Sequence, residues 1–192
     1  MSATNGTQME ELYTLSAAIT KNTFTTEAAI TGVLGTNTVC KIPGNWAGND
    51  CPNPVGRSLA LKLRGLAGNT AAATLVLNLG LDPTAGTKAN AIAVMTATAP
   101  PVAAGGPINL DVEYTITAYA TSTMSLQVNG TFVMDASNGG AGSASALRTG
   151  FQGLLTGVDP RVDNYIELFG TWSASSASNT TTIHQMKLYG EN

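Results

Sequence analysis

The sequence predicts an all-β protein, an antiparallel β-sandwich of jelly-roll type with an extended N-terminal arm. Two observations support this fold class. Apolar and polar residues alternate along many short segments, which is the period of a strand with one buried face and not that of a helix. Gly, Pro, Asn and Asp, the residues typical of turns, separate these segments. Residues 1–10 lack this alternation and are expected to form the arm, and residues 11–192 are expected to form a single domain.

The clearest strand lies at residues 108–117 (INLDVEYTIT), where every even position is apolar and every odd position is polar. Residues 58–64 (SLALKLR) place three leucines on one face and both cations on the other. Further strands are expected at 11–19, 23–30, 36–42, 73–79, 88–96, 124–132, 164–174 and 180–189. Residues 147–156 (LRTGFQGLLT) fit either a strand or a single helical turn. About ten one-sided antiparallel strands are expected to close as two sheets packed face to face.

Three long connections are rich in Gly, Pro, Asn, Ser and Ala. They are expected at residues 43–57, 97–107 and 135–146. Long loops in a compact domain are commonly contact surfaces or mobile tips. We therefore expect contacts with other molecules to involve the arm, residues 1–10, and the loop at 43–57 that contains Trp46.

Charged residues make up 11% of the chain, against about 25% in an ordinary soluble domain. The formal net charge is −3, and no cluster of Lys or Arg is present, so nucleic acid is not an expected partner. A surface with few charges suggests that neighbours cover it in an assembly; a monomer hydrated through Thr and Asn is the alternative. No signal peptide and no apolar run long enough to span a membrane are visible, so we expect synthesis in the cytoplasm and no membrane insertion.

The candidate catalytic residues are few and scattered. On a strand at 180–189, His184 would share a mostly apolar face with Met186 and Leu188, which favours a core or interface histidine. Asp111 and Glu113 lie two apart on one strand face, a spacing that suggests a glycosidase-like pair, but a solvated outer face is the better interpretation. No enzyme activity, metal site or cofactor is expected.

Cys40 and Cys51 enclose ten residues that include Trp46. A disulfide between them would restrain this loop, whereas a reducing cytoplasm would keep both thiols free. Trp46, in a loop, is a candidate interface or ligand contact, for example a platform for a sugar ring. Trp172 shares a strand face with Ile166 and Leu168 and is expected in the core.

Several stretches in order along the chain resemble a broad group of tailed-bacteriophage virion proteins. They are IPGNW, NPVGRSLALKLRGL, TLVLNLGL, INLDVEYTITAYAT and DNYIELFGTWSASSASNTTTIHQMKL, within residues 40–190. The resemblance implies a β-sandwich structural protein of the virion without catalytic residues. In this view the final hairpin is architectural: Trp172 anchors the core and the Thr-rich last strand completes a sheet.

The resemblance and the low charge together favour a capsid decoration (cement) protein. It would be a homotrimer on the capsid exterior that binds the major capsid protein. A tail or baseplate component is one alternative, and a carbohydrate-binding module for recognition of the host surface is another.

Overall fold

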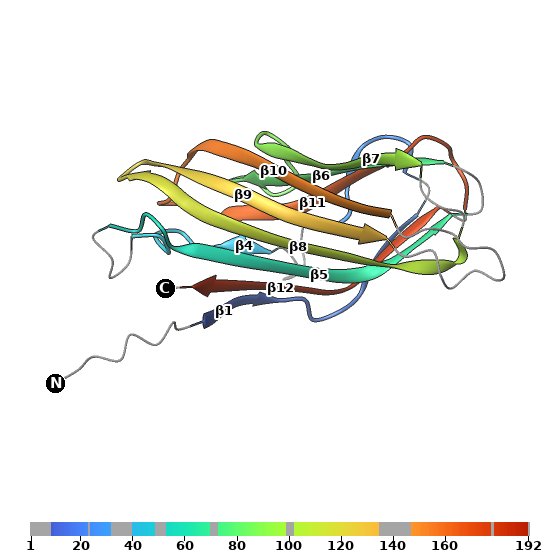
Figure 1. The fold of residues 1–192 in the computed structure, drawn as a ribbon, viewed down its shortest axis with the longest axis horizontal. Helices are drawn as coiled ribbons and strands as arrows, with labels where there is room; N and C mark the ends of the chain where they lie inside the picture. The colour runs from blue at the N-terminus through green and yellow to red at the C-terminus, as the bar shows by residue number, and fades with distance from the viewer. Residues whose placement is uncertain are drawn as a thin grey trace.

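The protein is described by a computed structural model that covers residues 9–22, 24–31, 40–48, 53–69, 73–98, 102–134, 147–177 and 179–191. In these ranges the strands form two sheets that face each other (Figure 1), and every strand pairing is antiparallel. The predicted all-β sandwich is confirmed. No helix that could span a membrane occurs in the described part of the chain.

The larger sheet has seven strands. Its order is β1 (Met9–Thr14), β12 (Thr180–Glu191), β5 (Ser58–Asn69), β8 (Val102–Ala120), β9 (Thr123–Met134) and β10 (Leu147–Val158), and β2 (Ile19–Asn22) also pairs with β12. The smaller sheet has five strands. Its order is β3 (Ala28–Ala29), β11 (Asn164–Trp172), β6 (Thr74–Asp82) and β7 (Ala91–Thr98), and β4 (Lys41–Ile42) also pairs with β11.

The strand pairs are nested in the manner of a jelly roll. The pair of β5 with β8 encloses the pair of β6 with β7 in sequence, and the pair of β1 with β12 encloses the pair of β3 with β11. From the outside inward, these nested pairs alternate between the larger and the smaller sheet, which is how a long folded hairpin wraps into a sandwich. The hairpin of β9 and β10 is an addition that widens the larger sheet beyond β8.

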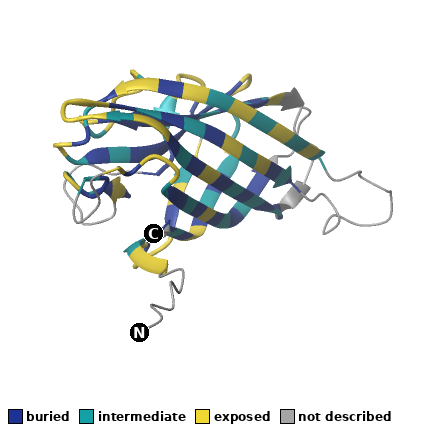
Figure 2. Ribbon diagram, turned by 60° about the vertical axis from the view of Figure 1, so that its left-hand side comes forward, coloured by how far each residue is buried: buried dark blue, intermediate teal, exposed yellow. Residues whose placement is uncertain are grey.

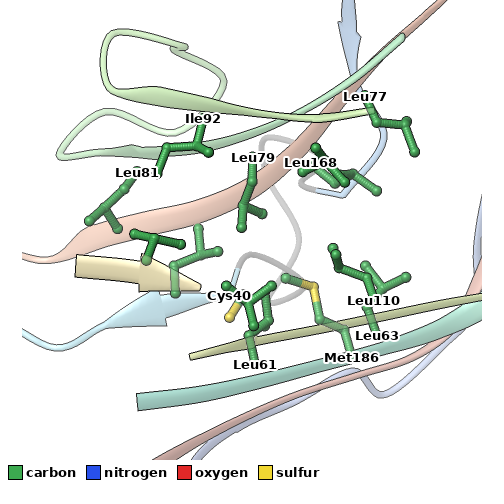
Figure 3. Packing of buried hydrophobic residues seen from close by; sticks show 14 of the residues in the cluster. Cys40, Leu61, Leu63, Leu77, Leu79, Leu81, Ile92, Leu110, Leu168 and Met186 are labelled. Carbon is green, nitrogen blue, oxygen red and sulfur yellow. The ribbon is translucent and has the colours of Figure 1, made fainter. Parts of the chain in front are cut away.

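The hydrophobic core lies between the two sheets, because alternate residues of each strand point inward. Figure 2 shows this alternation as blocks of buried and exposed residues along the long strands. Figure 3 shows leucines of the smaller sheet facing Leu61, Leu63, Leu110 and Met186 of the larger sheet, all four fully buried. Burying a leucine side chain contributes about 1.5–3 kcal/mol, so these facing rows dominate the stability of the fold.

Some expected boundaries differ in the structure. The loop expected at 97–107 is largely strand, because β8 begins at Val102 and pairs with the end of β5 as far as Asn69. Residues 147–156 are strand and not a helical turn, since they form the ladder of β10 with β9. The last two residues of the expected arm, Met9 and Glu10, belong to β1. Residues 1–8 and the loop 135–146 lie outside the described residues.

Candidate functional site

The outer face of the larger sheet carries an open groove with a volume of about 690 Å³. Each of the four strands β5, β8, β9 and β10 contributes three consecutive residues to its lining. These are residues 60–62, 111–113, 129–131 and 150–152. A groove of this size falls in the range of about 300–1,000 Å³ that is usual for small-ligand sites.

Two rows of outward-facing residues cross the four strands at the groove. The register of the sheet places Lys62, Asp111, Thr131 and Gly150 in one row. It places Ala60, Glu113, Asn129 and Gln152 in the other. The row between them points into the sandwich, as the burial of Leu61 (0% exposed) and Val112 (4% exposed) shows. Polar side chains therefore line the groove on its open side.

An ion pair fixes the carboxylate of Asp111 at the groove. The Nη2 atom of Arg64 donates to both carboxylate oxygens of Asp111, at 2.7 and 3.1 Å. The Nη1 atom of the same arginine donates to the backbone carbonyl of Leu63 at 2.8 Å. Because both partners are partly exposed, this ion pair adds little to stability. Its effect is to hold one groove carboxylate in a defined position.

The two glycines of the groove have different roles. A Cβ atom on Gly130 would lie 2.2 Å from the ring of Phe151, its cross-strand neighbour, so a side chain there would collide with the inner face of β10. A Cβ atom on Gly150 would meet nothing closer than 3.9 Å. Gly150 is exposed and leaves the backbone of β10 open to a ligand in the groove.

The side chains in the groove suit hydrogen bonding better than proton transfer or metal binding. Asn129 and Gln152 supply amides, Thr131 a hydroxyl, Lys62 an ammonium group and Glu113 a carboxylate, so donors and acceptors are both present. In the described ranges, no group of three or more His, Cys, Asp or Glu residues could hold a metal ion. The groove can thus recognise a polar ligand through several hydrogen bonds at once.

Trp46, the candidate interface or ligand contact, is buried in the structure. Its side chain is 7% exposed, and the guanidinium carbon of Arg57 lies 4.4 Å from the centre of its ring. Arg57 also donates to the backbone carbonyl of Trp46 at 2.9 Å. Gly190 of β12 leaves room for the indole, since a Cβ there would approach it to 2.8 Å. Trp46 closes one side of the core and offers no stacking surface.

His184 is exposed and therefore does not lie in the core, the first of the two positions expected for it. The register of β12 against β5 shifts between Ile183 and Gln185, and this β-bulge leaves both His184 and Gln185 on the outside. Ile183 and Met186, on either side, are fully buried. The bulge therefore reverses the alternation that places His184 among apolar neighbours.

The other residues singled out from the sequence are structural or lie outside the described part. Trp172 is fully buried, as predicted, and its ring centre lies 6.5 Å from that of Phe24. Cys40 is 1% exposed, and burial raises the pKa of its thiol, which keeps it protonated and unreactive. Cys51 lies outside the described residues, so the disulfide stays a prediction.

A second polar cluster sits on the smaller sheet and holds the loop between β6 and β7. Glu167 is 1% exposed, and its Oε2 atom accepts the backbone N–H of Gly86 at 2.6 Å. Asp82 accepts the N–H of Thr84 at 2.8 Å. Burial, together with the nearby charge of Asp82, raises the pKa of Glu167. This cluster fixes a loop and does not open to a ligand.

Sequence reasoning missed most of the groove residues. Lys62, Asn129 and Thr131 are visible in the sequence only as polar positions of alternating strands, and Gln152 lies in the segment that fits either strand or helix. Asp111 and Glu113 were singled out as a carboxylate pair, and the structure places both in the groove. The missing information is the register that sets these positions side by side.

Comparison with known proteins supplies no family. No family model matches the chain, and no curated protein matches it. Among solved structures, the chain is similar to the CBM2 module of the evolved Dit of Lactobacillus casei BL23 phage J-1, with a TM-score of 0.38 and 12% sequence identity over 97% of each chain. A similarity at this level carries no argument about function, which has to be drawn from the site.

Proposed function

We propose that this protein is a non-catalytic carbohydrate-binding protein of a phage virion, and that the groove on the outer face of the larger sheet holds the sugar. The observation that carries the proposal is the pair of polar rows that cross β5, β8, β9 and β10 at the groove. The virion setting rests on the sequence resemblance to tailed-phage structural proteins. Trp46 has no part in the proposal, because it is buried.

The chemistry of the groove fits a sugar chain. Sugar hydroxyls both donate and accept hydrogen bonds, and the amides of Asn129 and Gln152 do the same. Ala60 and Gly150, which stand at opposite ends of the two rows, leave room for a ring beside the polar groups. Since the groove is built on four paired strands, its backbone is held in place before a ligand arrives, and Arg64 holds the carboxylate of Asp111; this lowers the cost of binding.

The test is a groove-filling variant with a matched control. In Thr131→Trp a large side chain occupies the groove; in Thr117→Trp the same side chain stands on an exposed position of β8 that does not line it. Binding to an array of bacterial surface polysaccharides is measured for the wild type and both variants. We expect loss of binding in Thr131→Trp and retention in Thr117→Trp. Equal binding by all three proteins, or no binding by the wild type, would contradict the proposal.

Capsid decoration is the second candidate function, and the low charge of the chain favours it. Charged residues are 11% of the sequence, so a large part of the surface can be covered by neighbours at a small desolvation cost. An antibody to this protein, imaged on intact particles by electron microscopy, separates the two candidates. Label over the whole head would favour decoration, and label at the tail would favour recognition of the host.

A further inference from the structure

The free edges of the two sheets differ in how they are protected against pairing with another chain. At one edge of the larger sheet, β1 is six residues long and carries Glu10 and Glu11. At the edges of the smaller sheet, β3 and β4 have two residues each, and the pairing of β7 is interrupted by a register shift at Leu77 and Asn78. Short strands, charges and bulges are the usual protections of a sheet edge.

Strand β10, at the other edge of the larger sheet (Figure 1), lacks these protections over most of its length. It has 12 residues, no proline and one charged residue, Arg148. In the described part of the chain, β9 is the one strand that pairs with it, and their ladder is regular from Leu147 to Leu155 before the register shifts. Leu154 is exposed at 56% on this strand. A long, regular and nearly uncharged edge can pair with another strand.

The sequence of this edge is complementary to itself. Antiparallel pairing of residues 147–155 with a second copy has a two-fold axis at Phe151, so Phe151 faces its own copy and Leu147 faces Leu155. These three side chains share the inner face, where Leu147 and Phe151 are partly buried against the core. On the outer face Arg148 would stand opposite Leu154 of the second copy, so no like charges oppose each other.

We propose that β10 is a self-association edge, through which two copies of this chain join by antiparallel pairing of residues 147–155 into one continuous sheet. The partner is a second copy because this register places Leu147 opposite Leu155 and Phe151 opposite its own copy on the inner face, with the small residues Thr149 and Gly153 between these contacts. It also avoids charge repulsion on the outer face. The pairing is two-fold, so the trimer expected from the sequence would need a different surface.

This pairing has a consequence for the groove, although the inference does not depend on sugar binding. Gly150 and Gln152 line the groove and lie on β10, so the two grooves of a pair would lie on either side of the shared edge. A repeating polysaccharide could then contact both sites. Two linked sites bind more tightly than one through effective concentration.

The first test compares two substitutions at the same exposed position. Leu154→Lys places a cation opposite Arg148 of the second copy, and Leu154→Glu places an anion there. Because the pairing is two-fold, each dimer contains two such contacts. We expect the dimer Kd, measured by sedimentation velocity, to rise in Leu154→Lys and to fall in Leu154→Glu, each by roughly two- to thirtyfold. A wild type that stays monomeric at its highest soluble concentration would overturn the proposal, as would an equal change in both variants.

The second test measures the register directly. In the proposed pairing Gly150 faces Gln152 of the second copy, within the distance that a disulfide spans. With Cys51 replaced by Ser, the double variant Gly150→Cys/Gln152→Cys should form a covalent dimer on oxidation. A variant with only one of these cysteines should not form the covalent dimer, because in this register the cysteine lies two residues away from the same cysteine of the second copy. Cross-linking by the single variants as well, or by none of the three, would refute this register.

Discussion

Replacement of Gly65 by alanine tests the close approach of β5 and β12 at the bulge. A Cβ atom on Gly65 would lie 2.2 Å from the carbonyl oxygen of Thr182, against an ordinary contact of 3.4 Å or more. The backbone would thus have to move by about 1.2 Å. Thr182 cannot give way easily, because β12 is paired with β2 on one side and β5 on the other. Overpacking of this kind costs about 1–3 kcal/mol, and we expect the upper part of that range because the contact is with backbone.

The assay is urea denaturation of Gly65→Ala beside a matched control, Gly150→Ala. The Cβ atom of the control meets nothing closer than 3.9 Å, so its free energy of unfolding should stay within about 0.5 kcal/mol of the wild type. A free energy of unfolding of Gly65→Ala within this margin would contradict the expected clash. It would mean that the bulge at His184 is adjustable and that the two strands are not held together as described.

Two further substitutions test the interior. Burial raises the pKa of Glu167 above its ordinary value of 4.5, because it favours the protonated carboxyl group. The contribution of this protonated group to the stability of the fold is fully present below pH 4.5 and is lost as pH rises through the folded-state pKa. Glu167→Gln should therefore be more stable than the wild type at neutral pH, by about 1–3 kcal/mol, with the gain vanishing towards pH 4 in thermal melts. A gain that is the same at both pH values would contradict this. Trp172→Ala removes a fully buried indole that contacts Phe24. We expect urea denaturation to show a free energy of unfolding that is lower by about 3–5 kcal/mol. A decrease below about 1 kcal/mol would place the indole outside the core.

The fold class was predictable because strand alternation is a local property of the sequence. Residues 108–117 show it without interruption, and they form the middle of β8. The first strands are shorter than expected, since the segment at 11–19 is divided between β1 and β2, and the described part of the segment at 23–30 contains only the two residues of β3. In β10 the alternation is obscured by Gly150 and Gly153. Glycines carry no side chain to mark a face, so the ladder with β9 becomes visible only in three dimensions.

The candidate site was not predictable to the same degree, because it depends on contacts between distant segments. The groove forms where Lys62, Asp111 and Thr131 fall opposite one another, and pairing register cannot be read from strands taken one at a time. The burial of Trp46 depends on Arg57 and Gly190, which lie elsewhere in the sequence. A loop rich in Gly and Asn suggests exposure, and here tertiary packing reverses that expectation.

Binding of carbohydrate in the groove on the larger sheet can be followed residue by residue in solution. The most direct measurement is a titration of the ¹⁵N-labelled protein with bacterial cell-wall polysaccharide fragments, followed by amide chemical shifts. We expect shift changes concentrated at the lining of the groove, residues 60–62, 111–113, 129–131 and 150–152. Changes concentrated on the smaller sheet or around Trp46, or no changes at saturating fragment, would contradict binding in the groove.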